Sequence, residues 1–338
     1  MTNRELLGDP VQLRYEFEEA FDLMALSVEK HLSAAPAVIR NYTAHLAKST
    51  GKFIRAYGLL ACSMDEEDKV PPEAVTLASA VELLHLATLV HDDVIDDADT
   101  RRGIETLQQK FGKKAAVICG DYLLSLALKL AASIPERNEY NALDMPNYLC
   151  RICMGELRQE INNGNLDLSV YRYLSIIKGK TAALFEASFH GGAMLSTKDE
   201  KKLRMYRKAG NHVGMIFQLM DDCIDYEMEE AQAKKNVRSD YEEGVVTLPL
   251  IHTMKQDESF SGQVKGGLVS ARELYDRVLE AGGTVYTKAV AGRYYAKASD
   301  AIGNLELSQA KKARIMTVVD KSYYGIKNHK NIKQHKEE

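Results

Sequence analysis

Two aspartate clusters with the same spacing are the part of this sequence best suited to chemistry. In the segment LVHDDVIDDADTRRG, residues 89–103, Asp92 and Asp96 stand four residues apart and Asp93 lies beside them. Residues four apart on a helix lie on one face, about one turn from each other. Carboxylates held together at the end of an apolar helix repel one another unless a cation compensates. The cluster therefore indicates a cation site, although a solvated acidic helix end explains a single such run at least as well.

The second cluster makes the solvated interpretation harder to maintain. In the segment GMIFQLMDDCIDYE, residues 214–227, the acids Asp221, Asp222 and Asp225 repeat the D-D-x-x-D spacing inside another apolar helical pattern. Oxygen ligands without His or Cys at metal spacing favour a hard cation, and Mg²⁺ commonly uses one or two carboxylates together with substrate phosphate oxygens. Paired across a cavity, the two clusters would form a clamp for a diphosphate.

The elements that must position these acids are helices. Apolar residues recur at helical spacing in long blocks. These blocks are roughly 11–31, 35–63, 73–96, 112–132, 145–162, 169–196, 199–229, 243–255, 262–281, 284–302 and 307–325. Almost nothing alternates as a strand would, and no Pro/Gly/Ser-rich linker divides the chain. We expect an all-α fold, with a single helical domain over residues 1–326 and a polar, mostly basic tail at 327–338.

Composition narrows the classes of function. The chain has 338 residues, 45% hydrophobic and 27% charged, which is enough to bury a large core. A net charge of -4 provides no basic field for nucleic acid. The amino terminus lacks the apolar stretch of a signal peptide, and no segment is expected to span a membrane. An odd number of cysteines, five, suits a reducing cytoplasm, and the C-x-x-C pair Cys150 and Cys153 is expected to pack inertly.

At the two clusters the sequence resembles the trans-isoprenyl diphosphate synthases, the polyprenyl synthase family, over about Gly51 to Leu250. The ordered signatures are GKFIRA (51–56), ELLHLATLVHDD (82–93), RRG (101–103), GELRQ (155–159), IIKGKTAALF (176–185) and DYEEGVVTLPL (240–250). The resemblance implies an isoprenoid-synthase helical bundle around a central active-site cavity. It also implies Mg²⁺-assisted coupling of an allylic diphosphate to isopentenyl diphosphate. The chain departs from the family at Phe53, at Ala56 and in KKNVRSD (234–240), which leaves the shape of the second pocket and of the lid loop open.

The resemblance also implies a role for each matching residue. The ligands expected for about three Mg²⁺ ions are Asp92, Asp93, Asp96, Asp221 and Asp222. The residues expected to contact the allylic diphosphate directly are Arg101, Lys180 and Lys235. Those expected to place the allylic group or to complete the second cluster are Thr181, Gln218 and Asp225. Those expected to hold isopentenyl diphosphate are Lys52, Arg55, His85 and Arg102.

Product length is expected to depend on the side chains below the first cluster. Short-chain members of the family typically carry an aromatic residue five positions before the first aspartate, where this chain has Ala87, with Leu84 one turn earlier. By analogy with the family, we expect the floor of the product tunnel, the part below the first cluster, to be open. We therefore expect an all-trans product of roughly thirty to fifty carbons. A short-chain farnesyl or geranylgeranyl synthase is the alternative.

Other interpretations differ in how the chain would work. A terpene cyclase needs no second diphosphate pocket, so Lys52, Arg55 and His85 speak against it. A non-catalytic regulatory subunit generally loses the aspartates, which this chain keeps. The catalytic subunit of a heteromeric synthase that is inactive alone remains open. Since members of the family are generally dimers, the resemblance implies a homodimer.

Overall fold

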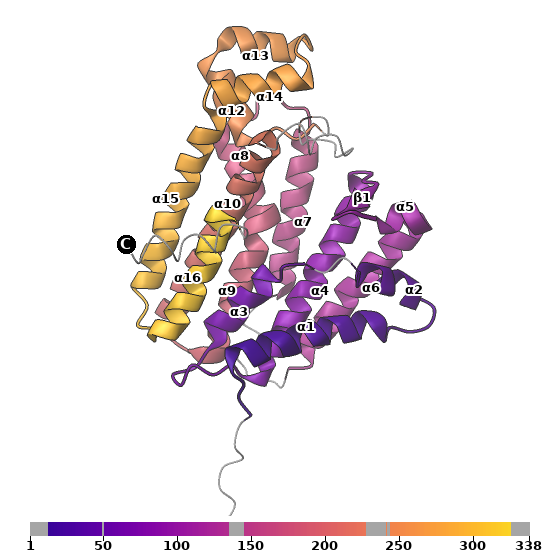
Figure 1. Cartoon of the computed structure of the whole chain (residues 1–338), viewed down its shortest axis with the longest axis vertical. Coiled ribbons are helices and arrows are strands. Elements are labelled where there is room, and N and C mark those ends of the chain that lie inside the picture. Colours follow the sequence, from indigo (N-terminus) through magenta and orange to yellow (C-terminus); the bar gives the residue numbers. More distant parts are fainter. Residues whose placement is uncertain (1–12, 49–50, 135–144, 228–240, 242–243, 326–338) are drawn as a thin grey trace, which may run out of the picture. The chain divides into compact units, whose positions relative to one another are not determined.

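The computed structural model describes residues 13–48, 51–134, 145–227, 241 and 244–325, which form helices joined by turns and one short hairpin (Figure 1). The elements of the first half are α1 (Phe17–Ser33), α2 (Arg40–Leu46), α3 (Ile54–Ser63), α4 (Pro72–Ile95), β1 (Thr100–Arg101), β2 (Ile104–Glu105), α5 (Leu107–Phe111), α6 (Lys113–Ala132) and α7 (Met145–Asn162). Those of the second half are α8 (Val170–Ile177), η2 (Lys178–Ala182), α9 (Ala183–Ser196), α10 (Glu200–Glu227), α12 (Leu248–Gln256), α13 (Glu258–Lys265), α14 (Ala271–Glu280), α15 (Gly283–Gly303) and α16 (Gln309–Tyr324). The all-α prediction is confirmed.

The boundaries differ from the sequence pattern at several places, and α5 lies outside every predicted block. The block predicted at 35–63 is two helices, α2 and α3, and the block predicted at 262–281 is α13 and α14. The antiparallel hairpin of β1 and β2 lies at 100–105, where the sequence shows no alternation. Each break coincides with a capping or turn residue: Phe53 before α3 is left-handed, at φ 49°, and Ser270 caps α14 by accepting from the backbone N–H of Glu273.

Contacts divide the chain into two compact units that are interleaved in sequence. The first contains residues 1–142, 190–199 and 307–314, and the second contains 143–189, 200–306 and 315–338. Helices α9 and α16 each contribute residues to both units. The single domain predicted over residues 1–326 stays a prediction, and the predicted tail at 327–338 lies outside the described residues.

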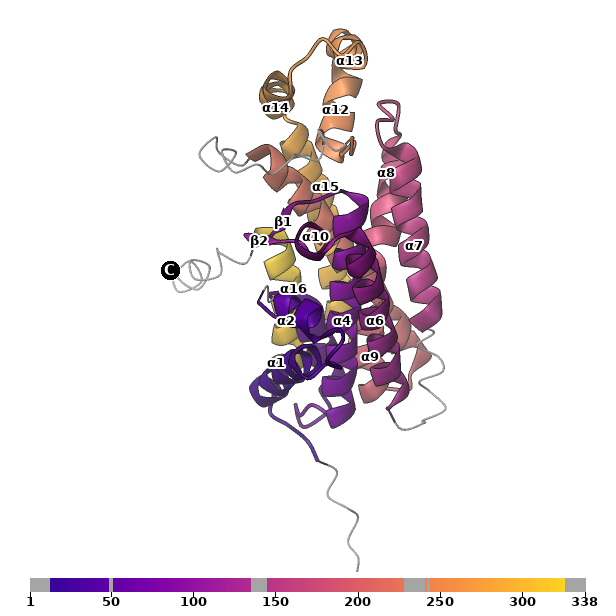
Figure 2. The ribbon, with the colours of Figure 1, turned by 90° about the vertical axis from the view of Figure 1, so that its right-hand side faces the viewer.

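Helix α4 is the central element of the first unit. It begins with Pro72, whose fixed φ and missing N–H suit the first helical turn, and it packs against α1, α3 and α6 (Figures 1 and 2). Its fully buried side chains include Leu77, Ala78, Ala80, Val81, Leu83, Leu84 and Ala87. Burying a leucine side chain contributes about 1.5–3 kcal/mol. This packing fixes the carboxyl end of α4, which carries the first aspartate cluster.

Helix α10 has the corresponding place in the second unit. It runs along α15 and also contacts η2, α12 and α14. The core around it includes Leu219, Leu248, Leu250, Phe260 and Leu274, each at most 1% exposed. Because α10 presents its apolar face to this core, the second aspartate cluster near its end is held in a fixed setting.

The short π-helix η2 is pressed between two glycines of the second unit. A Cβ on Gly155 of α7 would overlap the backbone nitrogen of Lys180, and a Cβ on Gly214 of α10 would overlap the Cα of Ala182. Both contacts are with backbone, so a larger residue would require η2 to move. π-Helical turns are rare and occur often at functional sites.

The expectation that no segment spans a membrane stays a prediction, whereas the expectation that Cys150 and Cys153 pack inside the protein is wrong. Helices α4 and α6 are long and apolar enough to cross a membrane by length and composition, although 61% of the relevant stretch of α4 is buried, as in a soluble core helix, against 28% for α6. One or two such helices are weak evidence for a membrane protein. Cys150 and Cys153 lie in helix α7 as predicted, but both are exposed rather than packed.

Candidate active site

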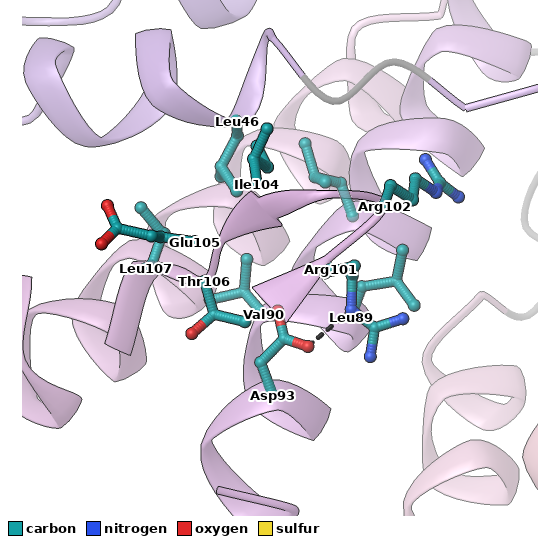
Figure 3. A pocket seen from close by; sticks show the side chains of 11 residues that line it. Leu46, Leu89, Val90, Asp93, Arg101, Arg102, Ile104, Glu105, Thr106 and Leu107 are labelled. Atoms are coloured by element: carbon teal, nitrogen blue, oxygen red, sulfur yellow. Dashed lines mark hydrogen bonds and ion pairs between the residues drawn. The ribbon is translucent and has the colours of Figure 1, made fainter. Parts of the chain in front are cut away.

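The first aspartate cluster lies at the end of α4 and is followed by a tight hairpin. The two residues of its turn, Arg102 and Gly103, have φ of 52° and 82°, as a type I′ turn requires. Glycine adopts this conformation readily, whereas a non-glycine residue such as Arg102 seldom does. The turn directs Arg101 back to α4, where its Nε lies 2.5 Å from Oδ1 of Asp93 (Figure 3).

Asp93 is the most enclosed carboxylate of this cluster. It is 5% exposed, whereas Asp92 is half-buried and Asp96 is exposed. Burial raises the pKa of Asp93, and the adjacent Arg101 guanidinium opposes that shift. Asp93, Arg101 and residues of β2 line a small, partly open hollow whose other walls are mostly apolar (Figure 3).

Basic side chains gather beside this cluster within the first unit. Nη1 of Arg55, from the first turn of α3, lies 3.1 Å from Nε2 of His85 on α4. Burial, together with the nearby guanidinium groups of Arg55 and Arg102, holds the pKa of His85 well below its ordinary value. His85 is therefore neutral at pH 7 and accepts a hydrogen bond from Arg55. Arg102 also lies close to Gly51, the residue before the exposed Lys52. Of the four residues expected to hold isopentenyl diphosphate, the structure therefore brings Arg55, His85 and Arg102 together.

A buried carboxylate supports this basic group. Glu82 on α4 is 7% exposed and accepts a hydrogen bond of 2.9 Å from the backbone N–H of Ala56. Burial raises the pKa of Glu82, and the charges of Arg55 and Arg102 oppose the shift. Glu82 thus fixes the start of α3 against α4 and supplies negative charge next to two arginines.

The second cluster is held by hydrogen bonds from other elements of the second unit. Asp222 is 2% exposed; the hydroxyl of Tyr173 on α8 donates to its Oδ2, and Nε2 of Gln218 donates to its Oδ1 at 2.8 Å. The hydroxyl of Thr181 in η2 donates in turn to Oε1 of Gln218 at 2.6 Å. The predicted residues Thr181, Gln218 and Asp222 therefore form one continuous chain with Tyr173.

The other two acids of the second cluster are more open. Asp221 is exposed, and Asp225 is half-buried and accepts a hydrogen bond of 3.2 Å from Tyr275 on α14. Burial raises the pKa of Asp222 to about 7, since the hydrogen bonds from Tyr173 and Gln218 only partly offset desolvation and the like charges of Asp221 and Asp225 add to it.

Lys180 of η2 has a carboxylate partner on α7. Its Nζ lies 2.8 Å from Oε2 of Glu156, and both side chains are 24% exposed. One further turn along, Glu186 of α9 pairs with Arg151 of α7 through two contacts of 3.0 and 2.8 Å. In one pair α7 supplies the acid, Glu156, and in the other it supplies the base, Arg151. Together the two ion pairs fix the register of α7 against the segment that carries Lys180 and Thr181.

The donor set fits magnesium. Both clusters offer oxygen ligands, and within the described part of the chain no three Asp, Glu, His or Cys side chains converge closely enough to hold an ion alone. Mg²⁺ usually takes only one or two carboxylates and completes its shell with water and substrate phosphate oxygens. A carboxylate such as Asp222, which burial and neighbouring acids make costly to ionise, gains from a bound cation.

The structure locates nearly all of the predicted site residues. Within each unit, it brings together most of the residues that were expected to cooperate, while the pairing of the two clusters across a cavity stays a prediction because they belong to different units. Lys235 lies outside the described residues, and Ala87 and Leu84 are both 1% exposed on α4. The sequence reasoning missed the supporting residues Glu82, Glu156, Tyr173 and Tyr275. Glu82 and Glu156 stand inside quoted signatures, whereas no local signal marks the tyrosines.

Comparisons with known proteins agree on one class. A profile of the Polyprenyl synthetase family matches residues 36–274. Heptaprenyl diphosphate synthase component 2 of Bacillus subtilis is 33% identical over 248 residues, which are 72% of this chain and 70% of that protein. Octaprenyl diphosphate synthase of Escherichia coli is 36% identical over 215 residues, 61% of this chain and 64% of that protein. A solved polyprenyl synthase from Caulobacter crescentus, in complex with calcium and isoprenyl diphosphate, matches with a TM-score of 0.79 and 26% identity over 90% of this chain and 95% of that one.

The helical fold and the aspartate-rich site thus define a trans-prenyltransferase. The chain belongs to the polyprenyl synthetase family, as its sequence predicts.

Proposed function

We propose that this chain joins an allylic diphosphate to successive isopentenyl diphosphate molecules and releases an all-trans polyprenyl diphosphate of roughly thirty to fifty carbons. The observation that carries the proposal is the family match over residues 36–274, which includes both D-D-x-x-D clusters. Relatives named for heptaprenyl and octaprenyl products support the length. The solved relative that holds calcium and isoprenyl diphosphate supports the combination of a divalent cation with this substrate class.

The barrier in such a coupling is charge separation, because the allylic carbon–oxygen bond ionises to diphosphate and a carbocation. In the proposal, Asp92, Asp93 and Asp96 together with Asp221 and Asp222 would hold about three Mg²⁺ ions, which supply Lewis acidity and a template for the leaving group. Lys180, Arg101 and Lys235 donate to the departing oxygens, where a well-placed donor contributes about 3–4 kcal/mol. Asp225 completes the second cluster, and the methyl and methylene groups of Thr181 and Gln218 place the allylic group.

The basic group of the first unit would bind the second diphosphate. Arg55, Arg102 and Lys52 present the positive charge that isopentenyl diphosphate requires, and His85 is neutral, so it acts through hydrogen bonding rather than charge. Arginine suits this task because its planar fork matches phosphate oxygens. Holding both substrates in line converts a bimolecular reaction into an effectively unimolecular one.

Product length would depend on the floor near Ala87 and Leu84. Both side chains are buried on α4, and an alanine occupies far less volume than the aromatic residue of short-chain enzymes. The growing chain would extend past Ala87 until larger side chains stop it.

A heteromeric enzyme is the second candidate. The relative from Bacillus subtilis is named component 2 of its synthase, which favours a partner subunit for proteins of this type. A homodimer remains our primary expectation, with cytoplasmic location. Exposed apolar side chains on α7, namely Met154, Leu157 and Ile161, would be covered by a second copy.

Incorporation of labelled isopentenyl diphosphate tests the proposal. Purified protein with Mg²⁺ and farnesyl diphosphate should convert the label to an extractable product, and chelation with EDTA should abolish conversion. D92N and D221N should each reduce the rate by about 10²–10³ or more, as for removal of a key electrostatic group. Full activity of both variants would contradict the assignment. Absence of activity in the wild-type protein alone, restored by a second subunit, would favour the heteromeric candidate.

A further inference from the structure

Tyr173 makes a contact that the resemblance did not assign. It lies in the middle of α8, is 3% exposed, and belongs to the apolar core of the second unit, yet its hydroxyl points to a carboxylate. That carboxylate is Asp222, the second acid of the D-D-x-x-D cluster on α10. A buried tyrosine hydroxyl normally finds a hydrogen-bond partner, and any nearby backbone carbonyl could serve. Here the partner is instead a carboxylate of the proposed metal site, 49 residues away in the sequence.

The contact works together with a second one on the same carboxylate. Tyr173 donates to Oδ2 of Asp222 and Gln218 donates to Oδ1, so each oxygen has one donor. A carboxylate oxygen has two lone-pair sites, so each oxygen retains one for another partner. The two donors come from α8 and α10, and together they fix the plane of the carboxylate.

The support behind Tyr173 is itself rigid. Ser169 caps α8 by accepting from the backbone N–H of Arg172, and Ile176 and Ile177 anchor the same helix in the core, each 5% exposed. A tyrosine ring has two rotatable side-chain bonds, so little freedom remains once the ring is packed. The hydroxyl is therefore presented to Asp222 from a fixed point.

We infer that Tyr173 is a positioning residue that orients the carboxylate of Asp222 for binding of a divalent cation. The inference rests on the proposed function, in which Asp222 is a cation ligand. Groups that orient metal ligands from behind commonly change cation affinity by about 10–100-fold when they are removed. In this inference Tyr173 acts through its hydrogen bond to Asp222 rather than by contact with substrate or cation.

The chain offers a matched control for the test. Tyr295 on α15 donates a hydrogen bond of 2.7 Å to Oδ1 of Asp320 on α16, a tyrosine–carboxylate pair outside both aspartate clusters. Y173F and Y295F each remove one hydroxyl and keep the ring. Both variants should fold and lose some thermal stability, since each leaves a carboxylate with one donor fewer.

Cation binding separates the two variants. Binding of Mn²⁺ in the presence of inorganic diphosphate, measured by calorimetry, should weaken about 10–100-fold in Y173F and stay within about twofold of wild type in Y295F. In the coupling assay, the Mg²⁺ concentration for half-maximal rate should rise by a similar factor in Y173F, and saturating Mg²⁺ should restore most of kcat. If Y173F is unstable at the assay temperature, the calorimetric comparison at 10 °C decides.

Two results would overturn the inference. One is unchanged Mn²⁺ affinity in Y173F, and the other is an equal loss in Y173F and Y295F, which would indicate a general effect on folding. The calorimetric measurement of Mn²⁺ binding needs no turnover, so its result does not depend on whether the chain catalyses the proposed reaction. If wild type binds Mn²⁺ with diphosphate but makes no prenyl product, the proposed function fails and the role of Tyr173 can still be judged.

Discussion

Nζ of Lys180 lies 2.8 Å from Oε2 of Glu156, while the backbone of the same lysine rests directly on Gly155. One turn of α7 thus holds Lys180 twice, once by charge and once by close backbone contact. Lys180 lies in the π-helical segment η2, which also directs the neighbouring Thr181 to Gln218. Through this segment, packing of α7 is linked to the side chains expected to bind the allylic diphosphate.

Replacement of Glu156 tests the ionic half of this arrangement. Because both partners are partly exposed, the pair contributes about 1 kcal/mol or less, so E156Q should change KM for the allylic diphosphate by less than about fivefold. K180A should lower kcat/KM by about 10²–10³, since it removes a donor to the leaving group. Steady-state kinetics give both values, with E160Q on the same helix as control. Equal losses in E156Q and K180A would show that the pair, rather than the lysine charge, is required.

Substitution of Gly155 tests the packing half. G155A places a methyl group against the backbone of η2, and overpacking of this kind costs about 1–3 kcal/mol, so the thermal midpoint should fall and activity with it. Gly262 in α13 is the matched control, because a Cβ there meets nothing within 4 Å. G262A should stabilise the protein by about 0.5–1 kcal/mol. A fully stable and active G155A would contradict the close packing of η2 against Gly155.

Glu186 provides the pH-dependent prediction. Burial would raise the pKa of Glu186, but hydrogen bonds and charge from Arg151, with help from Arg207, hold it below its ordinary value of 4.5. A carboxyl with a lowered folded-state pKa stabilises the protein above its unfolded pKa, and this contribution is lost as pH falls through the folded pKa. Wild-type stability should therefore decline below about pH 4.5 in part because of this group.

E186Q removes that contribution at neutral pH. It should lower stability by about 1–3 kcal/mol at pH 7, because Arg151 loses its charged partner, and the difference from wild type should shrink at acidic pH. Thermal midpoints recorded from pH 7 down to about pH 3, well below the ordinary pKa of 4.5, give the comparison, with E160Q as the exposed control. A difference that is constant across the range would show that the charge of Glu186 does not matter.

Ala87 and Leu84 should set product length in opposite directions. A87Y fills the floor and should shift products toward fifteen or twenty carbons, whereas L84A enlarges it and should shift them upward. Both residues are 1% exposed, so folding must be verified by thermal unfolding before products are sized. Unchanged products from an active A87Y would exclude this position as the limit on length.

The sequence predicts the parts of this protein that depend on local spacing. Helix α4 and both D-D-x-x-D clusters follow from apolar periodicity and from acids four residues apart, because a helix places such residues on one face. The break between α2 and α3 does not follow, since Phe53 adopts a left-handed φ of 49° that nothing in its neighbourhood requires. The hairpin is missed because each strand has two residues, too few for any alternation.

The supporting contacts of the site depend on tertiary structure instead. Tyr173 and Tyr275 are each about fifty residues from the acids they contact, at separations of 49 and 50, so no pattern along the chain connects them. Glu82 and Glu156 could have been singled out as charged residues within helical signatures. Their partners, a backbone N–H at Ala56 and the ammonium of Lys180, become visible only once the helices pack.

Product sizing tests the central claim most directly. Purified protein should be incubated with Mg²⁺, farnesyl diphosphate and excess isopentenyl diphosphate, and the dephosphorylated products separated by chain length. We expect all-trans polyprenols of about thirty to fifty carbons that form with Mg²⁺ and not after chelation. Products that stop at fifteen or twenty carbons, or product formation that persists without a divalent cation, would contradict the account.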